Sequence, residues 1–203
     1  PMIYKGISPI LAAVLVVAFT TVVTMCMVDG ITKKSVAAML GTIIGVVFSG
    51  AFALIFGQVT SITGYNVSDI ENLVYVGEMT DIKIGELLFA GILIASLGAV
   101  MDVGMSIAST LNELKEQNPQ MMLKELFQSG MNVGRDMMGT MTNTLILAFT
   151  GGSINTLVFI FAYNYEYQQV INMYSVGIEI MQGLSSSLGV IMAVPVTSWI
   201  AAF

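Results

Sequence analysis

The feature that limits this chain most is a series of long stretches with almost no charged residues. A transmembrane helix needs about 20 mostly apolar residues. Five stretches meet that length: residues 8–28, 35–58, 86–109, 135–162 and 177–203. Backbone groups cannot be left unpaired in lipid, so such stretches must be helical or belong to a closed barrel. The sequence therefore predicts an all-α helical membrane bundle with five crossings, which forms a single transmembrane domain over residues 1–203.

The composition excludes several classes of function. Only 10% of the residues are charged, whereas a soluble domain carries about 25%. The chain has no histidine and one cysteine, Cys26, which removes Ser-His-Asp catalysis, His-ligated zinc and an internal disulfide. A net charge of −6 gives no basic surface for nucleic acid. We therefore expect no enzyme activity, no cofactor or metal, no nucleic-acid partner, and a lipid bilayer as the environment.

Local signals refine two of the connections. Gly151-Gly152 interrupts the fourth stretch, and the apolar run after it can continue the same span beyond a kink. Between the third and fourth spans, residues 119–130 form an amphipathic pattern with Pro119 in its first turn and Gly130 at its end. This pattern predicts a separate helix in the cytoplasmic interface, either resting on the bilayer or moving as a coupling element.

The basic residues set the orientation. Cytoplasmic loops of membrane proteins carry an excess of Lys and Arg. With one crossing per span, five of the seven basic residues fall on one side: Lys33, Lys34, Lys115, Lys124 and Arg135. The other side has Lys5, Lys83 and an acidic loop with Asp69, Glu71, Glu78, Asp81 and Glu86. We expect the N-terminus outside, the C-terminus in the cytoplasm, and a bacterial cell membrane as the location.

One acid lies inside a predicted span. Asp102 is in the third stretch, about seven residues from its cytoplasmic end, or roughly 10 Å deep at 1.5 Å per residue. Helical spacing puts it on one face with small or hydroxyl residues: Gly91, Ala95, Gly98, Ser106 and Ser109. Small residues allow close approach of another helix. We therefore expect Asp102 to point into the bundle rather than toward lipid.

The fourth span offers polar partners for this acid. About seven residues in from Arg135, Thr140, Asn143 and Thr144 share one helical face at the expected depth of Asp102. We expect a cluster of these residues with Asp102 and Ser106, which serves either as a proton or cation site or as an interhelical hydrogen-bond clasp. Arg135 and Asp136 form either an interfacial salt bridge or cap, or a gate.

A second acid, Glu179, lies near the outer end of the fifth span. Tyr163, Tyr165, Tyr167 and Tyr174 lie close to it in the sequence. Such aromatic residues are typical of the membrane interface. The cluster is therefore interpreted as an aromatic belt, with a ligand site as the alternative.

Three segments carry a resemblance to a known family. They are GAVMDVGMSIAS (98–109), SGMNVGRDMMGTMTNTL (129–145) and LGVIMAVPVTS (188–198). Together they resemble the YibE/F-like membrane proteins, and the resemblance covers nearly the whole chain. It implies a multi-pass membrane protein and no particular activity.

A more distant resemblance concerns the region from Gly98 to Leu145. Its acid, polar linker and Thr/Asn-rich helix are similar to the membrane half of the Sec accessory exporters of the resistance-nodulation-division (RND) superfamily. This resemblance implies an RND-like half-bundle in which Asp102 carries protons. The chain lacks the large extracytoplasmic insert of those exporters and contains one half-bundle rather than two.

These observations lead to two functional hypotheses. The first is a membrane subunit of a proton-coupled transporter or export machinery, and the second is a structural membrane subunit that organises a partner complex. In either case we expect a homodimer or a heterodimer with a related subunit, because the first and fifth spans are rich in small residues that favour helix packing. On the fifth span these include Gly183, Ser185, Ser186, Ser187 and Gly189.

Overall fold

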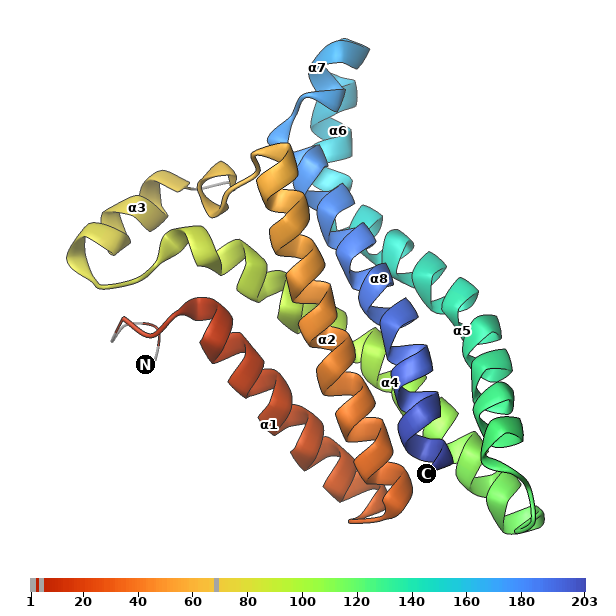
Figure 1. The fold of residues 1–203 in the computed structure, drawn as a ribbon. Helices are drawn as coiled ribbons and strands as arrows, with labels where there is room; N and C mark the ends of the chain where they lie inside the picture. The colour runs from red at the N-terminus through yellow and green to blue at the C-terminus, as the bar shows by residue number, and fades with distance from the viewer. Residues whose placement is uncertain (1–2, 4–5, 68–69) are drawn as a thin grey trace.

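The structure is a computed structural model that describes residues 3, 6–67 and 70–203, and these residues form helices with no strand among them. The described residues form five long helices and several short ones (Figure 1). The long helices are α1 (Pro9–Asp29), α2 (Lys33–Thr60), α4 (Leu87–Gln117), α5 (Leu123–Gly152) and α8 (Tyr174–Ala202). The short elements are η2 (Gly64–Asn66), α3 (Ile70–Met79), η3 (Ile84–Glu86), α6 (Ile154–Ala162) and α7 (Tyr167–Ile171).

The long helices agree with the predicted spans. Four helical segments are long and apolar enough to cross a membrane: α1, α2, α8, and α4 together with the preceding η3. Helices α5 and α6 are bent by 54° where they meet, and they form a fifth span if they are taken together. The bend lies at Ser153, directly after the Gly151-Gly152 pair that predicts an interruption. The all-α membrane bundle is confirmed.

The prediction of a separate interfacial helix over residues 119–130 is wrong. Helix α5 begins at Leu123 and continues without interruption through Gly130 to Gly152. Gly130 does not end a helix; it is buried where α5 packs on its neighbours. A methyl group at this position would lie 2.7 Å from Ser198 Oγ and 3.0 Å from Leu111 Cδ1. The glycine is therefore required for close helix packing, which the local pattern cannot distinguish from a helix end.

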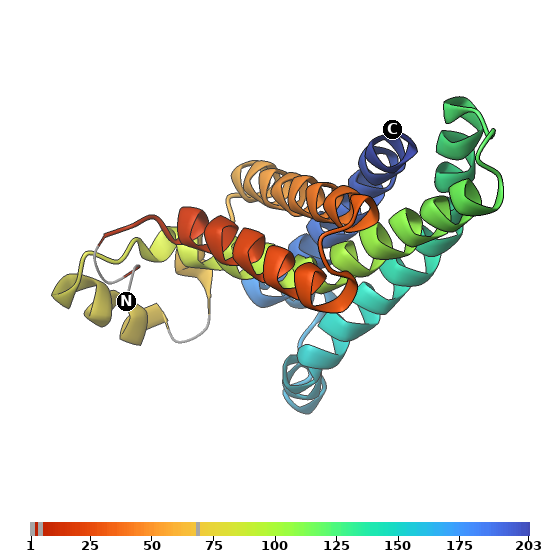
Figure 2. The ribbon, with the colours of Figure 1, turned by 90° about the horizontal axis from the view of Figure 1, so that it is seen from below.

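The core is formed by α2, α4 and α8, which pack closely on one another. Gly45 of α2 and Gly189 of α8 face each other where the backbones of the two helices approach closely. A methyl group on Gly45 would lie 3.1 Å from the carbonyl oxygen of Gly189, and one on Gly189 would lie 3.0 Å from that of Gly45. Helices α1 and α5 flank this core (Figure 2): α1 packs on α4 and α2, and α5 packs on α8 and α4.

The central position of α8 overturns one argument for a dimer. The small residues expected to form a surface between subunits are buried within the chain itself: Gly183, Ser185, Ser186, Ser187 and Gly189. They are buried because α8 packs against α2, α4 and α5. A surface for a second subunit must therefore be sought elsewhere.

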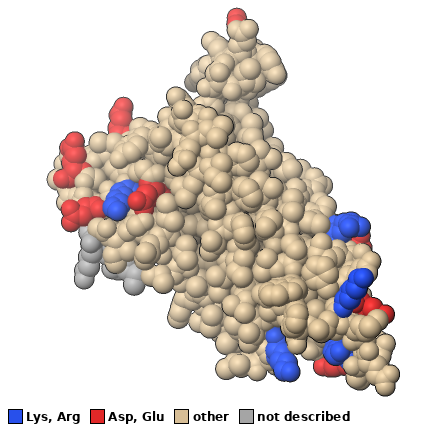
Figure 3. All heavy atoms as spheres, in the orientation of Figure 1, with Lys and Arg blue, Asp and Glu red and all other residues tan. Residues whose placement is uncertain are grey.

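Charged residues gather at two ends of the molecule. Figure 3 shows acidic residues around α3 at one end, and most of the basic residues at the other end, where α1 joins α2 and α4 joins α5. Ion pairs join Lys34 to Asp29 at 2.7 Å and Lys83 to Glu86 at 3.9 Å. Lys5 and Asp69, which entered the orientation prediction, lie outside the described residues. The charge-poor middle of the visible face is the part that suits a bilayer.

Candidate functional site

Asp102 lies in the middle of α4, fifteen residues from each end of the helix (102 − 87 and 117 − 102). Its side chain is exposed on the chain, and so are Gly91, Ala95 and Gly98 on the same face. Methyl groups on Gly91 and Gly98 would meet nothing within 4 Å. The expectation that Asp102 points into the bundle of its own chain is therefore wrong.

The other side of α4 explains this orientation. Its large apolar side chains are fully buried: Ile92, Val100, Val103 and Ile107 have 0% of their surface exposed. They face the core, where close van der Waals packing of large side chains stabilises a helix bundle in lipid. The small and acidic residues are consequently left on the uncovered side. We call the residues Gly91, Ala95, Gly98 and Asp102 the α4 face.

Helix α5 runs antiparallel to α4, as predicted, with a shifted register. Methyl groups on Gly130 and Gly134 would lie 3.0 Å from Leu111 Cδ1 and 3.1 Å from Ile107 Cδ1. Extending this register places Asp102 level with Gly139. Asn143 lies four residues beyond Gly139, which is about 6 Å along the helix at 1.5 Å per residue. The two helices also diverge from their connection (Figure 1).

The predicted polar cluster is therefore not assembled within one chain. Thr140, Asn143 and Thr144 are exposed on α5, and Ser106 is half-buried on α4. The Thr144 hydroxyl donates to the Thr140 carbonyl oxygen at 3.0 Å, within its own helix. Among the described residues, no hydrogen bond joins Asp102 to any of these side chains. Two polar helix faces thus lie uncovered on neighbouring helices.

Arg135 and Asp136 also differ from expectation. Both are exposed, and they lie twelve and thirteen residues after the start of α5 at Leu123. A residue so far inside a helix cannot cap it, so the cap interpretation is wrong. In the part of the chain that the structure describes, neither residue forms an ion pair. A role as a gate stays a prediction.

Sequence reasoning missed a buried seam of hydroxyl groups. Within the described residues, six hydroxyl oxygens between the core helices are buried and without a hydrogen-bond partner: those of Thr42, Ser49, Ser185, Ser186, Thr197 and Ser198. The sequence contains a signal for this seam on α2. Ser49 follows Gly41 and Gly45 at intervals of four residues, so the three small residues share one face of the helix. In lipid such small residues let two backbones approach closely.

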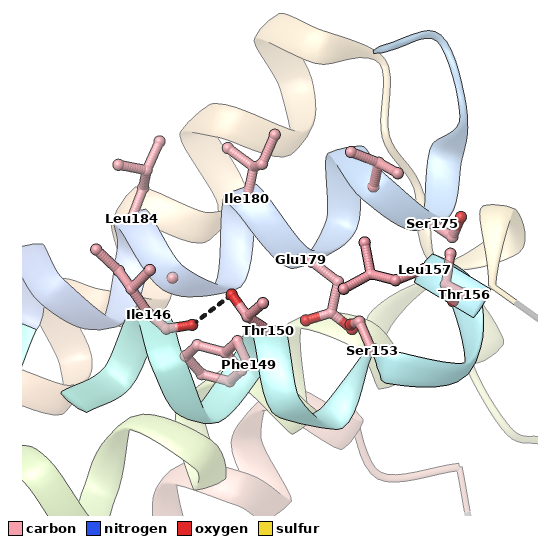
Figure 4. Close-up of a pocket in the computed structure, with 12 residues that line it drawn as sticks. Ile146, Phe149, Thr150, Ser153, Thr156, Leu157, Ser175, Glu179, Ile180 and Leu184 are labelled. Atoms are coloured by element: carbon pink, nitrogen blue, oxygen red, sulfur yellow. Dashed lines mark hydrogen bonds between the residues drawn. The ribbon is translucent and has the colours of Figure 1, made fainter. Parts of the chain in front are cut away.

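A cavity of about 350 Å³ lies between the α5–α6 bend and α8 (Figure 4). Its wall includes Glu179, which sequence reasoning interprets as part of an aromatic belt with a ligand site as the alternative. The four tyrosines of that belt are exposed around the same end of the molecule: Tyr163, Tyr165, Tyr167 and Tyr174. The bend that forms the cavity has a sequence signal in Gly151-Gly152, but the cavity itself depends on how α6 and α8 pack.

Comparison with known proteins gives one family. The model of the YibE/F-like protein family matches residues 1–203, which is the full length of the sequence. No curated protein and no solved structure matches the chain.

Proposed function

The chain belongs to the YibE/F-like protein family, and from this premise we propose that it is a membrane subunit of a proton-coupled transporter or export assembly. It is a multi-pass membrane protein with four or five spans. We further propose that it works by proton transfer at Asp102 rather than by enzyme catalysis.

The position of Asp102 carries this proposal. A charged side chain at the centre of a span costs about 2.5–3.5 kcal/mol on insertion scales, and such residues usually face a bundle interior or a water-filled cavity. On this chain Asp102 is exposed, about seven residues inside the cytoplasmic end of the predicted span 86–109. Asp102 is costly to place in lipid, and Asn or Ser could form the hydrogen bonds of a simple clasp in its place. The acid is therefore better explained by proton uptake and release during transport.

The uncovered faces support a second membrane subunit. The α4 face has no large side chain, and the neighbouring α5 exposes Asn143 and Thr144. Close packing of another helix on these residues would remove Asp102 from lipid and supply polar neighbours. We therefore propose a homodimer, or a pair with a related subunit, whose interface includes α4. The distant resemblance to RND exporters, which contain two related halves, points the same way.

The charge distribution supports the proposed orientation. The basic ends of α2, α4 and α5 would face the cytoplasm, and the acidic α3 region would face outside. Both the N-terminus outside and the location in a bacterial cell membrane remain part of the proposal.

A structural role is the competing function, and the exposed polar side chains of α4 and α5 favour it. The polar groups of α4 and α5 can form a clasp between subunits without any titration, since such contacts typically contribute about 0.6–2 kcal/mol. The two functions differ in what happens when Asp102 can no longer release a proton.

The test is the variant Asp102→Asn in proteoliposomes that contain a pH-sensitive dye. Asn keeps the size and hydrogen-bonding capacity of Asp but cannot titrate. We expect the wild type to pass protons under an imposed potential and Asp102→Asn to fall to the level of empty liposomes. Glu71→Gln on exposed α3 removes an acid outside the spans and should match the wild type.

Two results would contradict the proton-transfer role. One is a wild-type flux no higher than that of empty liposomes, and the other is an equal flux in Asp102→Asn. With correct insertion and unchanged assembly, either result leaves the structural role.

A further inference from the structure

The cavity beside Glu179 has the features of a binding site rather than a packing defect. Its volume of about 350 Å³ is within the range of small-molecule sites, about 300–1,000 Å³. The wall is mostly apolar, with Ile146 and Phe149 from α5 and Ile180 and Leu184 from α8. Figure 4 shows the helices from which these side chains come.

Two features of the chain keep this space open. Lower down, α5 and α8 touch so closely that a methyl group on Gly134 would lie 2.2 Å from Val194 Cγ1. At the cavity, a methyl group on Gly183 would still lie 3.9 Å from Phe149 Cδ2. The bend at Ser153 then turns α6 away by 54°. The glycine and the bend together leave a hollow that no side chain of the described residues fills.

The hollow contains one ionisable group. Glu179 is the only charged residue among those that line it. Its carboxylate points toward Ser153 in Figure 4, and no described residue forms an ion pair with it. The Ser153 hydroxyl oxygen is buried and has no hydrogen-bond partner in the described part of the chain. Glu179 and Ser153 thus lie side by side in the wall of the same apolar space.

This combination selects a class of ligand by its chemistry. Glu179 is half-buried, and a carboxylate against an apolar wall is costly unless it is paired, so an occupant that carries a positive charge is favoured beside it. The apolar wall favours an occupant whose remaining surface is hydrophobic. Glu179 lies five residues after the first residue of α8, Tyr174, or about 7.5 Å along the helix. Glu179 is therefore near the end of α8 that carries the exposed tyrosines, a residue type typical of the membrane interface.

We propose that this cavity is a binding site for hydrophobic organic cations, with Glu179 as the counter-ion and the walls of α5 and α8 around the apolar part. The site is separate from Asp102, because all of its lining residues belong to α5, α6, α8 and the Ser153 bend between α5 and α6. The proposal therefore holds whether or not the chain transports protons. The competing occupant is a lipid acyl chain, which would fill the apolar space and make no use of the carboxylate.

The experiment compares two probes of the same shape and opposite charge, tetraphenylphosphonium and tetraphenylborate. Binding is measured at equilibrium with the full chain in nanodiscs of neutral phosphatidylcholine, so that anionic lipid does not attract the cation. We expect saturable binding of the cation and none of the anion. Protein-free nanodiscs define the background for each probe.

The variants test the role of the carboxylate. Glu179→Gln keeps the shape of the side chain and removes its charge, so it should weaken tetraphenylphosphonium binding by about tenfold or more. Glu179→Asp keeps the charge and should bind more tightly than Glu179→Gln. Glu78→Gln on exposed α3 is the matched control and should bind like the wild type.

The proposal is overturned if Glu179→Gln binds the cation as tightly as the wild type. It is also overturned if the wild type binds tetraphenylborate as well as tetraphenylphosphonium, which is the result expected for an acyl-chain pocket. Glu179→Gln removes a charge from an apolar site, so it is expected to fold. A melting curve of each variant checks this.

Discussion

At the scale of single residues, glycines set how closely the core helices approach. A side chain on either Gly45 or Gly189 would press against the backbone carbonyl oxygen of the other residue. Within one chain Gly91 on α4 has no such role, because a methyl group there would meet nothing within 4 Å. The same residue type therefore has opposite consequences at two positions in neighbouring helices.

We expect Gly45→Ala to destabilise the protein. The new methyl group would lie 2.7 Å from Val100 Cγ1 and 2.8 Å from Ala193 Cβ, so α2 must move away from both neighbours. Overpacking of this kind costs about 1–3 kcal/mol. Thermal unfolding in detergent should show a lower melting temperature than the wild type. Gly139→Ala, at an exposed position of α5 with nothing within 4 Å, is the matched control and should leave the melting temperature nearly unchanged. Equal melting of the two variants would contradict the packing.

At the scale of helices, the sequence predicts where a helix exists better than where it ends or which of its faces is buried. Span positions follow from the length of apolar stretches, and all five regions are helical. The sequence could not show that the helix over residues 119–130 continues, because a glycine such as Gly130 suits both a helix end and a close contact, here with Ser198. The face of Asp102 was missed for a related reason. Helical spacing shows which residues share a face, but tertiary packing decides whether that face is covered.

The continuity of α5 gives a prediction at this scale. Spin labels at Lys124 and Gly139 would lie fifteen residues apart on one helix, which corresponds to about 22 Å along its axis. Pulsed electron paramagnetic resonance should show one narrow distance distribution near this value. A separate interfacial helix ending at Gly130 would turn the chain between the labels, and a clearly shorter or broad distribution would contradict the continuous helix.

At the scale of the whole molecule, the uncovered side determines how subunits can associate. Because Ser186 and Gly189 are buried within the chain, they cannot form the dimer interface that the small residues of the fifth span indicate. The α4 face is exposed and contains an acid that lipid disfavours. Small residues of the first span are buried as well, among them Ala13 and Thr21. The candidate interface thus moves from the first and fifth spans to the third.

Cysteine crosslinking in membranes tests this placement, in a Cys26→Ala background. We expect Ala95→Cys or Gly98→Cys to give a crosslinked pair, either of two copies or of this chain with a co-expressed relative. Ser186→Cys, which is buried in the core, and Phe19→Cys, which is 71% exposed on α1, should not. Crosslinking at Phe19 equal to that at the α4 face, or none at the α4 face at any protein-to-lipid ratio, would contradict the interface.

The central place of α8 also has a consequence for biogenesis. The main partner of α2 is synthesised more than a hundred residues after α2 ends at Thr60, since α8 begins at Tyr174. At about 5–20 residues per second, ribosomes need roughly 6–20 s to reach it. During that interval the Gly41, Gly45 and Ser49 face of α2 has entered the bilayer without the helix that covers it. Until the last span arrives, this face of α2 lacks the α8 residues that Gly41, Gly45 and Ser49 contact in the folded chain.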